Sequence, residues 1–364
     1  MSIKKTPLFD RHIALKGTMI NFGGYLLPTQ YTGIKQEHEN VRKKAGLFDV
    51  SHMGEFIISG SDADNFLQKL TINDITRLSP GQVQYSAMCY KDGGIVDDLL
   101  IYKYNNKYML VVNAANLEKD YNWLTSYKSN DVIIENISDK IGLIALQGPI
   151  SRKILQPLTE IELSKLNFYN FVEGRVDNIK CIISRTGYTG ELGFELYTDS
   201  QDIINLWDSL MNIGKDRGLK PAGLGCRDTL RMEMKYALYG NDIDETTNPI
   251  EAGLGWITRL KKNDFLGKEA LLDAKRNIKR KLVCIKMKER AIPRKGCPII
   301  INDKLVGEIT SGTMSPTIGE GIGIGYVALD YAKSGLELNI DIRGKIKAAV
   351  IIKPPFYNNG SLMD

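Results

Sequence analysis

The chain has little from which a metal site or a disulfide framework could be built. Its 364 residues contain only three histidines, His12, His38 and His52, and no two of them have the spacing of metal ligands. Its five cysteines are scattered, odd in number and never in CxxC spacing, so they indicate free thiols in a reducing cytoplasm. We therefore expect a cytoplasmic protein that binds no metal.

Long apolar runs and a strong charge of one sign are also missing. No run of about eighteen apolar residues is present, and the N-terminus MSIKKTPLFD lacks the apolar core of a secretory signal, so neither a membrane span nor export is expected. The net charge of +5 is mild and dispersed, which argues against a nucleic-acid partner but suits a protein partner with an acidic face. The length predicts two or three domains.

Residues 1–278 contain a mixture of predicted helices and strands. Helical spacing appears in Leu117–Leu124 and in Ile203–Leu210, and a further helix is predicted over Asp62–Leu70 with Ser61 as its cap. The strand-like runs are short and do not alternate regularly with helices, which favours an α+β fold over a doubly wound sheet. These runs are Glu55–Ser59, Ile95–Tyr102, Tyr108–Asn113, Cys181–Arg185 and Gly193–Tyr197. We expect two interleaved subdomains, about 1–50 plus 140–278, and 51–139.

After about Arg280 the chain changes to strands separated by turns. Asn302–Asp303 and Arg343–Gly344 are typical of tight hairpin turns. The predicted strands are Leu282–Met287, Ile299–Ile301, Leu305–Thr310, Ile322–Leu329, Leu336–Ile342 and Ile346–Ile352. Residues 279–364 are therefore predicted to form an all-β barrel domain. A strongly basic linker, Ala274–Lys281, is predicted before it.

The segment Gly223–Asp244, GLGCRDTLRMEMKYALYGNDID, has more ionisable residues near one end than a buried helix needs. Arg227 and Asp228 lie at the predicted start of a helix, where the cation of Arg227 opposes the helix dipole. An anionic partner or ligand would stabilise this arginine. A structural ion pair with Glu195 or Asp228 is the alternative, and one residue can fill both roles.

Carboxylates interrupt two otherwise apolar strands. Asp97 and Asp98 lie together in GGIVDDLLIY, where adjacent side chains point to opposite faces, so only one of them can face a given site. The other should be solvated or accept from a backbone donor. Paired carboxylates suggest acid–base chemistry, although a strand-end pair beside a Gly-Gly turn is the more ordinary explanation. Glu195 lies between Phe194 and Leu196 and also needs partners.

Other residues have both an ordinary explanation and a functional one. The turn Gly187–Glu191, GYTGE, is either a common hairpin loop or a place where a flat ligand approaches the backbone beside Tyr188. Asn113 ends an apolar strand with an amide that faces a site or a turn. Met53, Tyr85 and Tyr236 are either core residues, which is the commoner case, or walls of a ligand site.

A series of motifs along nearly the whole chain resembles the folate-dependent aminomethyltransferases, the family of the T protein of the glycine cleavage system. Each motif alone is weak, whereas their order and spacing together are specific. Besides the segment from Gly223, they are TPLFDRH (Thr6–His12), LFDVSHMGEF (Leu47–Phe56), GGIVDDLLIY (Gly93–Tyr102), LVVNAAN (Leu110–Asn116), ALQGP (Ala145–Pro149), SRTGYTGE (Ser184–Glu191), FLGKEAL (Phe265–Leu271) and GEITSGTMSPT (Gly307–Thr317).

The resemblance implies transfer of a one-carbon unit to tetrahydrofolate. The donor would be the aminomethyl group on lipoylated H protein, and the products 5,10-methylenetetrahydrofolate, ammonia and the dihydrolipoyl carrier. Asp98 would lie beside the reacting folate nitrogens, and Glu195 would accept two adjacent donors of the pterin. The other residues expected at the folate are Arg227, Tyr188, Asn113, Met53, Tyr85 and Tyr236. Catalysis would rest on positioning. A folate-binding scaffold or regulator without turnover is the alternative.

Three further observations refine this expectation. Leu192 stands where the family has an acid in GYTGE-x-G, and Phe22–Tyr25 replaces its usual FAGW, which affects the local shape of the site. Relatives of the fold that assemble iron–sulfur proteins carry a Lys-Gly-Cys motif where this chain has FLGKEAL without cysteine. The run Lys279–Arg280–Lys281 is predicted to dock the acidic carrier protein, the alternative being ordinary solvated surface.

Overall fold

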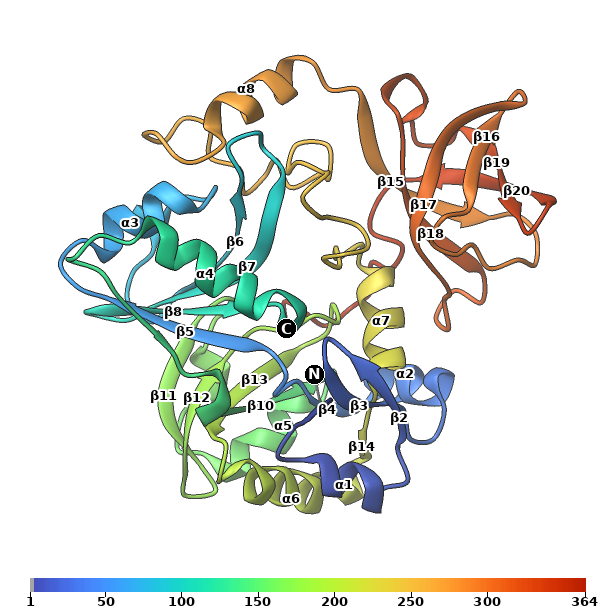
Figure 1. Ribbon diagram of the computed structural model, residues 1–364. Coiled ribbons are helices and arrows are strands. Elements are labelled where there is room, and N and C mark those ends of the chain that lie inside the picture. Colours follow the sequence, from blue (N-terminus) through green and yellow to red (C-terminus); the bar gives the residue numbers. More distant parts are fainter. Residues whose placement is uncertain (1–2) are drawn as a thin grey trace.

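The structure, a computed structural model, describes residues 3–364. Its strands form a three-stranded sheet, a five-stranded sheet, a six-stranded sheet and a closed six-stranded barrel. Figure 1 shows the barrel apart from the two larger sheets, with helix α7 (Leu224–Glu233) between them. This arrangement confirms the predicted α+β class with a C-terminal barrel.

The five-stranded sheet is antiparallel, in the order β6-β7-β8-β5-β9. One face packs against α3 (Ala63–Leu70) and α4 (Leu117–Tyr127), which bury Phe66 and Leu124. Asp62 rather than Ser61 precedes α3 and no side chain caps it, so the predicted cap is wrong: the chain turns at Gly60, with φ of 108°, and the helix starts later. The strands are β5 (Gly54–Ser59), β6 (Val83–Cys89), β7 (Ile95–Lys103), β8 (Lys107–Val112) and β9 (Ile133–Asn136).

The six-stranded sheet, in the order β11-β12-β13-β10-β4-β14, packs face to face with the five-stranded sheet. Leu143 and Ala145 of β10 join Met109 and Val111 of β8 in the core between the sheets. The opposite face is covered by α5 (Ser151–Leu155) and α6 (Ile203–Gly214). The strands are β4 (Ala45–Asp49), β10 (Ile141–Gln147), β11 (Phe171–Val176), β12 (Ile179–Ser184), β13 (Gly193–Asp199) and β14 (Leu219–Pro221).

The N-terminal segment forms the small sheet β1-β3-β2 and two helices. Buried His12 of α1 contacts the carboxylate of Asp49 at 2.8 Å and so ties this segment to the six-stranded sheet. The elements are β1 (Lys4–Lys5), α1 (Phe9–Ala14), β2 (Thr18–Phe22), β3 (Tyr25–Gln30) and α2 (Ile34–Lys43).

Residues 234–267, between α7 and α8 (Lys268–Arg276), contain neither an α-helix nor a strand of a sheet. They pack on one end of the five-stranded sheet, where Ile243 and Ile257 meet Ile95. The predicted basic linker Ala274–Lys281 is wrong in its bounds, because α8 runs to Arg276 and β15 already begins at Arg280.

The barrel closes in the order β15-β18-β17-β16-β19-β20. Its predicted strands and hairpins are confirmed: Asn302 and Asp303 have φ of 49° and 59°, and Arg343 and Gly344 have φ of 56° and 78°, as tight hairpin turns require. The strands are β15 (Arg280–Met287), β16 (Pro298–Ile301), β17 (Lys304–Met314), β18 (Gly321–Ala328), β19 (Glu337–Ile342) and β20 (Lys345–Ile352).

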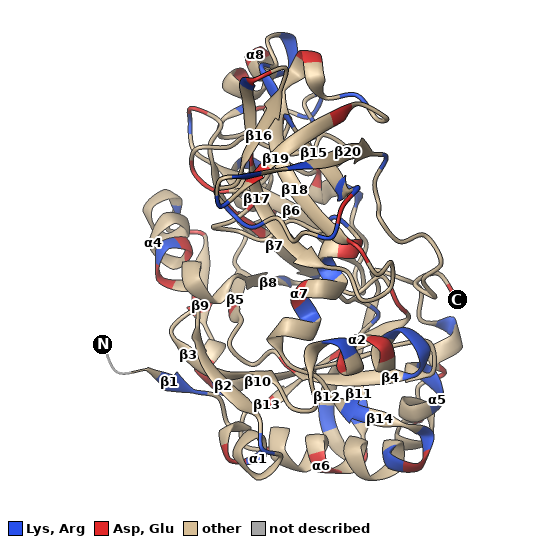
Figure 2. Ribbon diagram, turned by 90° about the vertical axis from the view of Figure 1, so that its right-hand side faces the viewer, with Lys and Arg blue, Asp and Glu red and all other residues tan. Residues whose placement is uncertain are grey.

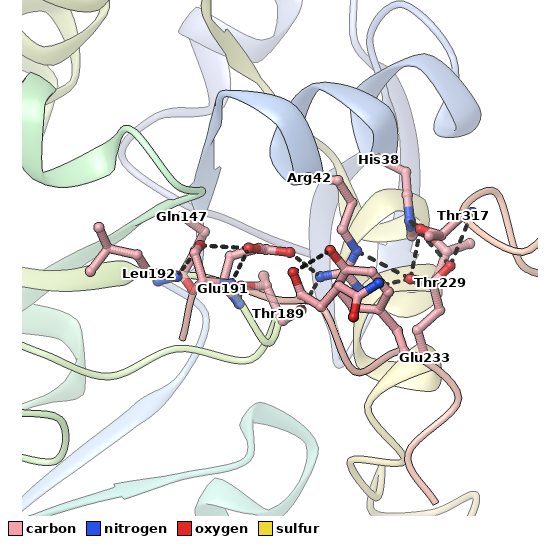
Figure 3. A network of polar contacts seen from close by, with 12 residues as sticks. His38, Arg42, Gln147, Thr189, Glu191, Leu192, Thr229, Glu233 and Thr317 are labelled. Carbon is pink, nitrogen blue, oxygen red and sulfur yellow. Dashed lines mark hydrogen bonds and ion pairs between the residues drawn. The ribbon is translucent and has the colours of Figure 1, made fainter. Parts of the chain in front are cut away.

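A buried ionic network joins the barrel to the rest of the molecule (Figure 3). Arg42 of α2 contacts Glu233 of α7 at 2.7 Å and Glu191 of the 187–191 loop at 2.8 Å. The same Glu233 accepts from Ser315 at 2.5 Å and Thr317 at 2.9 Å, both in the barrel domain. The ion pair of Arg42 with Glu233 thus joins four segments far apart in sequence.

Charged residues are dispersed over the surface. In Figure 2, lysines and arginines lie on α2, on α8 and on the barrel, with acidic residues among them. Within residues 3–364, no helix has the length and apolar composition needed to cross a membrane.

Candidate active site

Asp98 lies near the start of β7 within a set of polar contacts. Its carboxylate accepts a hydrogen bond from the Tyr85 hydroxyl at 2.9 Å and another from the Asn113 amide at 2.9 Å. Burial, followed by the charge of neighbouring Asp97, raises the pKa of Asp98 to about 7, although both hydrogen bonds favour the ionised form. A carboxyl group with such a pKa changes its charge near neutral pH.

The two adjacent carboxylates point to opposite faces, as strand alternation predicts. Leu99 packs on the helix side of the sheet, and Leu100 packs in the core between the sheets. By the same alternation Asp97 lies on the side of α4 and Asp98 on the side of the six-stranded sheet. Asp97 is fully buried and accepts from the backbone N–H of Asn113 at 3.1 Å, which meets the expectation of a backbone donor.

Arg227 lies over the ring of Tyr188, with its guanidinium carbon 4.6 Å from the ring centroid. Among residues 3–364 its guanidinium has no ion-pair or hydrogen-bond partner, so the predicted structural pair with Glu195 or Asp228 is not formed; Asp228 pairs with Arg231 at 2.9 Å. Burial lowers the pKa of Arg227. Five N–H donors therefore remain available to a ligand.

Tyr188 is held in place from both ends. Its hydroxyl donates to the carbonyl of Ala237, and its ring stacks on Tyr236 with centroids 5.5 Å apart and planes at 28°. The 187–191 loop that carries it is fixed by Arg42, which donates to the Thr189 carbonyl at 2.7 Å. The aromatic pair is consequently a rigid surface beneath Arg227.

Glu195 of β13 uses one oxygen and leaves the other free. Its Oε2 accepts from the Thr186 hydroxyl at 2.5 Å, and within the described chain Oε1 accepts no hydrogen bond. Burial raises the pKa of Glu195, while Thr186 and the charge of Arg227 oppose this rise. Because Glu195 is only 8% exposed, a ligand N–H group that donates to Oε1 would supply the hydrogen bond that this oxygen lacks.

The predicted residues come from separate elements but interact electrostatically. The charge of Asp98 contributes to the raised pKa of both Tyr85 and Tyr188, although burial is the main cause in each case. Asn113 directly follows β8, and its amide joins Asp97 to Asp98. Met53 is half-buried against the core between the sheets, so its position also suits an ordinary core residue.

Two aromatic residues near this site were not found from the sequence. Tyr169 has a φ of 62°, which is rare for a bulky residue, and the charges of Glu195 and Asp98 contribute to its raised pKa after burial. Trp256 is 63% exposed, and its ring lies 6.2 Å from that of Tyr85. Neither sits in a motif that sets it apart from core residues; an exposed tryptophan becomes informative only once its exposure is known.

The predicted docking run has three residues in different environments. Lys279 and Lys281 are exposed, whereas Arg280 makes two hydrogen bonds of 3.0 Å to Glu251 and lies over the Tyr326 ring. The backbone N–H of Leu282 also donates to the Glu251 carbonyl. The run thus lies against the segment that leads to Trp256. Among residues 3–364, no three His, Cys, Asp or Glu side chains are grouped as metal ligands would be.

Comparisons with known proteins agree over the full chain. Residues 8–262 match the GCVT N-terminal domain family, and residues 280–358 match the glycine cleavage T-protein C-terminal barrel domain. An aminomethyltransferase of Halothermothrix orenii is 50% identical over 97% of this chain and 100% of that protein. An aminomethyltransferase of Bacillus subtilis is 48% identical over 98% of this chain and 99% of that protein.

A solved structure agrees with the observed fold. The glycine cleavage system aminomethyltransferase T of Bartonella henselae superposes with a TM-score of 0.92 at 31% identity, covering 99% of each chain. The arrangement of sheets and barrel is therefore that of a known enzyme.

Proposed function

The chain belongs to the glycine cleavage T-protein family and is a tetrahydrofolate-dependent aminomethyltransferase, and from this premise we propose how its residues hold substrate and carrier. The one-carbon unit comes from the aminomethyl group on lipoylated H protein. The products are 5,10-methylenetetrahydrofolate, ammonia and the dihydrolipoyl carrier. The five cysteines are all free thiols, which supports work in a reducing cytoplasm.

The observation that carries the proposal is a pair of unused polar groups, Glu195 and Arg227, that interact electrostatically beside a rigid pair of aromatic rings. Glu195 has a free oxygen, and Arg227 has a free guanidinium over Tyr188. A pterin presents adjacent N–H donors, which Glu195 accepts, and a flat ring, which the stacked Tyr188 and Tyr236 support. Arg227 then binds an acceptor atom of the same ligand.

Asp98 is the catalytic residue of this proposal. Tetrahydrofolate, when bound, supplies the nitrogens that take up the one-carbon unit. Ionised Asp98, oriented by Tyr85 and Asn113, stabilises positive charge that develops there during transfer. Most of the catalytic gain comes from holding the reacting groups in place. Asn113, Tyr85 and Met53 orient Asp98 or border the ligand.

The carrier docks on the exposed lysines of the basic run. Lys279 and Lys281 attract an acidic protein surface, while Arg280 is held by Glu251 and fixes the strand that presents them. The adjoining segment reaches Trp256 beside Tyr85, which gives the lipoyl arm a route towards Asp98.

The test is ammonia release from aminomethylated H protein with and without tetrahydrofolate. We expect tetrahydrofolate to accelerate release, with 5,10-methylenetetrahydrofolate formed in equal amount. A protein that binds tetrahydrofolate but releases no additional ammonia from a loaded carrier would instead be the scaffold without turnover. Full-length aminomethyltransferase relatives do not favour that alternative.

A further inference from the structure

A fully buried carboxyl group behind Asp98 has no role in the proposal above. Asp120, in the first turn of α4, is fully buried, and neither of its oxygens accepts a hydrogen bond from an N–H or O–H group of residues 3–364. It contacts instead the carboxyl group of Asp97, which is also fully buried. Two ionised carboxylates cannot share a dry site, so one of the two must carry a proton.

The hydrogen bonds around the pair identify which one carries it. Asp97 accepts from the Asn113 backbone at 3.1 Å, the Asn113 amide at 2.9 Å and the Asn116 amide at 2.6 Å. Burial raises the pKa of Asp97, but these three donors oppose that rise and favour its ionised form, whereas Asp120 has no such donor among residues 3–364. Burial and the charge of Asp97 accordingly raise the pKa of Asp120 to about 11.

The pair is connected to Asp98 through a single amide. The Asn113 Nδ2 atom lies 2.9 Å from an oxygen of Asp97 and 2.9 Å from an oxygen of Asp98. An amide nitrogen has two hydrogens, one for each carboxylate. A continuous chain of contacts therefore runs from Asp120 through Asp97 and Asn113 to Asp98 and the Tyr85 hydroxyl.

We propose that Asp120 is a positioning residue that stays a neutral acid, donates its proton in a hydrogen bond to Asp97, and so keeps Asp97 ionised and Asn113 aligned behind Asp98. This inference rests on the proposed function of Asp98. Its consequence is electrostatic, because a fixed negative charge on Asp97 raises the pKa of Asp98.

The other charged and titratable groups around Asp120 do not replace this arrangement. Lys119 of the same helix donates to the Tyr239 hydroxyl at 2.7 Å, which places its ammonium with Tyr239 and Glu245. Asp97 faces Asp120 from β7, and the charge of Asp98 on the same strand adds a smaller contribution to the raised pKa of Asp120. Tyr90, which follows β6, is also within electrostatic reach, and its raised pKa, caused mainly by burial, keeps it neutral at physiological pH.

The first experiment observes the proton directly. An infrared spectrum of the full-length protein at pH 8 should contain absorption from neutral carboxyl groups, and Asp120→Asn should remove part of it. Glu55→Gln is the matched control, because Glu55 is 1% exposed and burial raises its pKa. Removal of Glu55 should abolish a separate component and leave that of Asp120. If Asp120→Asn leaves the absorption unchanged, Asp120 is ionised and the inference is wrong.

The second experiment follows ammonia release against pH. In Asp120→Ala, Asp97 loses its donor and takes up a proton, so the acid limb of the rate profile should move to lower pH by on the order of one unit. Asp120→Asn still donates to Asp97 and should keep the limb in place. Asp97→Asn removes the negative charge of Asp97 and should also move the acid limb of the rate profile to lower pH. This variant serves as the test if Asp120→Ala fails to fold.

The two readouts separate the failure of this inference from failure of the proposed function. A rate that falls in Asp120→Ala at every pH without any displacement of the limb indicates a merely structural residue and overturns the inference. Absence of ammonia release in every protein, wild type included, overturns the proposed function, while the infrared result still decides where the proton lies.

Discussion

Two arginines on neighbouring helices meet the same loop in opposite ways. Arg42 of α2 is 6% exposed and has two carboxylate partners, a carbonyl partner and the ring of Tyr357 at 4.1 Å. Arg227 of α7 lies over Tyr188 without any ion pair or hydrogen bond among residues 3–364. Arg42 contacts the 187–191 loop at Thr189 and Glu191, and Arg227 contacts it at Tyr188.

The difference separates scaffold from site. Buried charges in a scaffold have their partners within the protein, because an unpaired buried charge is costly. Incomplete sets of partners persist where a ligand completes them. The charged groups of the network around Arg42 all have partners within the protein. In contrast, the guanidinium of Arg227 and one oxygen of Glu195 have no hydrogen-bond partner among residues 3–364.

The largest expected effect tests the scaffold side. Arg42→Ala removes the guanidinium that buried Glu191 and Glu233 share, so the free energy of unfolding should fall by about 3–5 kcal/mol. Urea unfolding followed by circular dichroism measures this change. Arg227→Ala, measured in the same way without folate, should change the unfolding midpoint little. Equal losses for both variants would remove the distinction.

The next effect concerns catalysis. Asp98→Asn should lower the rate of ammonia release by roughly 10²- to 10³-fold, as loss of one transition-state charge contact does. Asp97→Asn should lower the rate less, because Asp97 faces α4 rather than the site.

In wild type the rate should rise with pH through about 7, since the ionised form of Asp98 is the active one. The asparagine variant should lack this limb. A larger loss in Asp97→Asn would mean that the assignment of the two carboxylates is reversed.

The same substitution has an opposite effect on stability. The folded-state pKa of Asp98 lies above its ordinary value, so the folded protein holds this proton more tightly than the unfolded chain does. The contribution of Asp98 to stability therefore falls as pH rises from about 4 to about 7. Asp98→Asn should consequently unfold at higher urea concentration than wild type above pH 7.

Arg227 itself gives the third prediction. Arg227→Ala should weaken tetrahydrofolate binding by about 1.5–3 kcal/mol, the contribution of a hydrogen bond to a charged group. Titration calorimetry measures the affinity. Arg11→Ala is a matched control, because Arg11 forms an exposed ion pair with Asp208 and should affect neither affinity nor stability. Unchanged affinity in Arg227→Ala would make Arg227 a structural residue despite its free guanidinium.

The barrel, and the opposite orientation of the two carboxylates at the candidate site, could be predicted from the sequence because their signals are local. Alternating strands and turn residues such as Asn302–Asp303 depend on neighbours in sequence, and the opposite orientation of Asp97 and Asp98 follows from strand geometry alone. The motifs also placed Arg227 at a helix start, only three residues after the observed first residue of α7.

The remaining site residues depend on contacts between distant segments. Asp120 is an unremarkable acid near a helix start until the packing of α4 on β7 brings it to Asp97. Tyr169 takes its unusual φ because its backbone donates to Arg185 and accepts from Val83, residues of two different segments. The basic linker was mistaken because its charged residues belong to regular elements: Lys275 and Arg276 form the last turn of α8, and Arg280 begins β15.

Glu195→Gln probes the other free group of the site. The amide can accept from one pterin donor but presents its own N–H groups to the second, so the free energy of tetrahydrofolate binding should weaken by about 1.5–3 kcal/mol. The rate at saturating folate should change less than the affinity. Calorimetry that finds unchanged affinity would exclude Glu195 from the pterin site.

The smallest expected effect concerns exposed lysines of the run 279–281, which have no buried partner among residues 3–364 and do not face the folate site. Lys281→Glu should raise the apparent KM for the loaded carrier by about two- to fivefold, because an exposed charge pair contributes up to roughly 1 kcal/mol. Folate affinity should stay the same. Added salt should raise the KM of wild type, since exposed charges are screened over about 8 Å at physiological ionic strength.

Lys345→Glu is the control: the pairing of β20 with β15 puts this exposed lysine beyond Met287, at the end of β15 opposite to Lys281. A KM equally raised in both variants would mean that overall charge, rather than the run at 279–281, attracts the carrier. A KM that ignores both the substitution and the salt would leave the run as ordinary solvated surface.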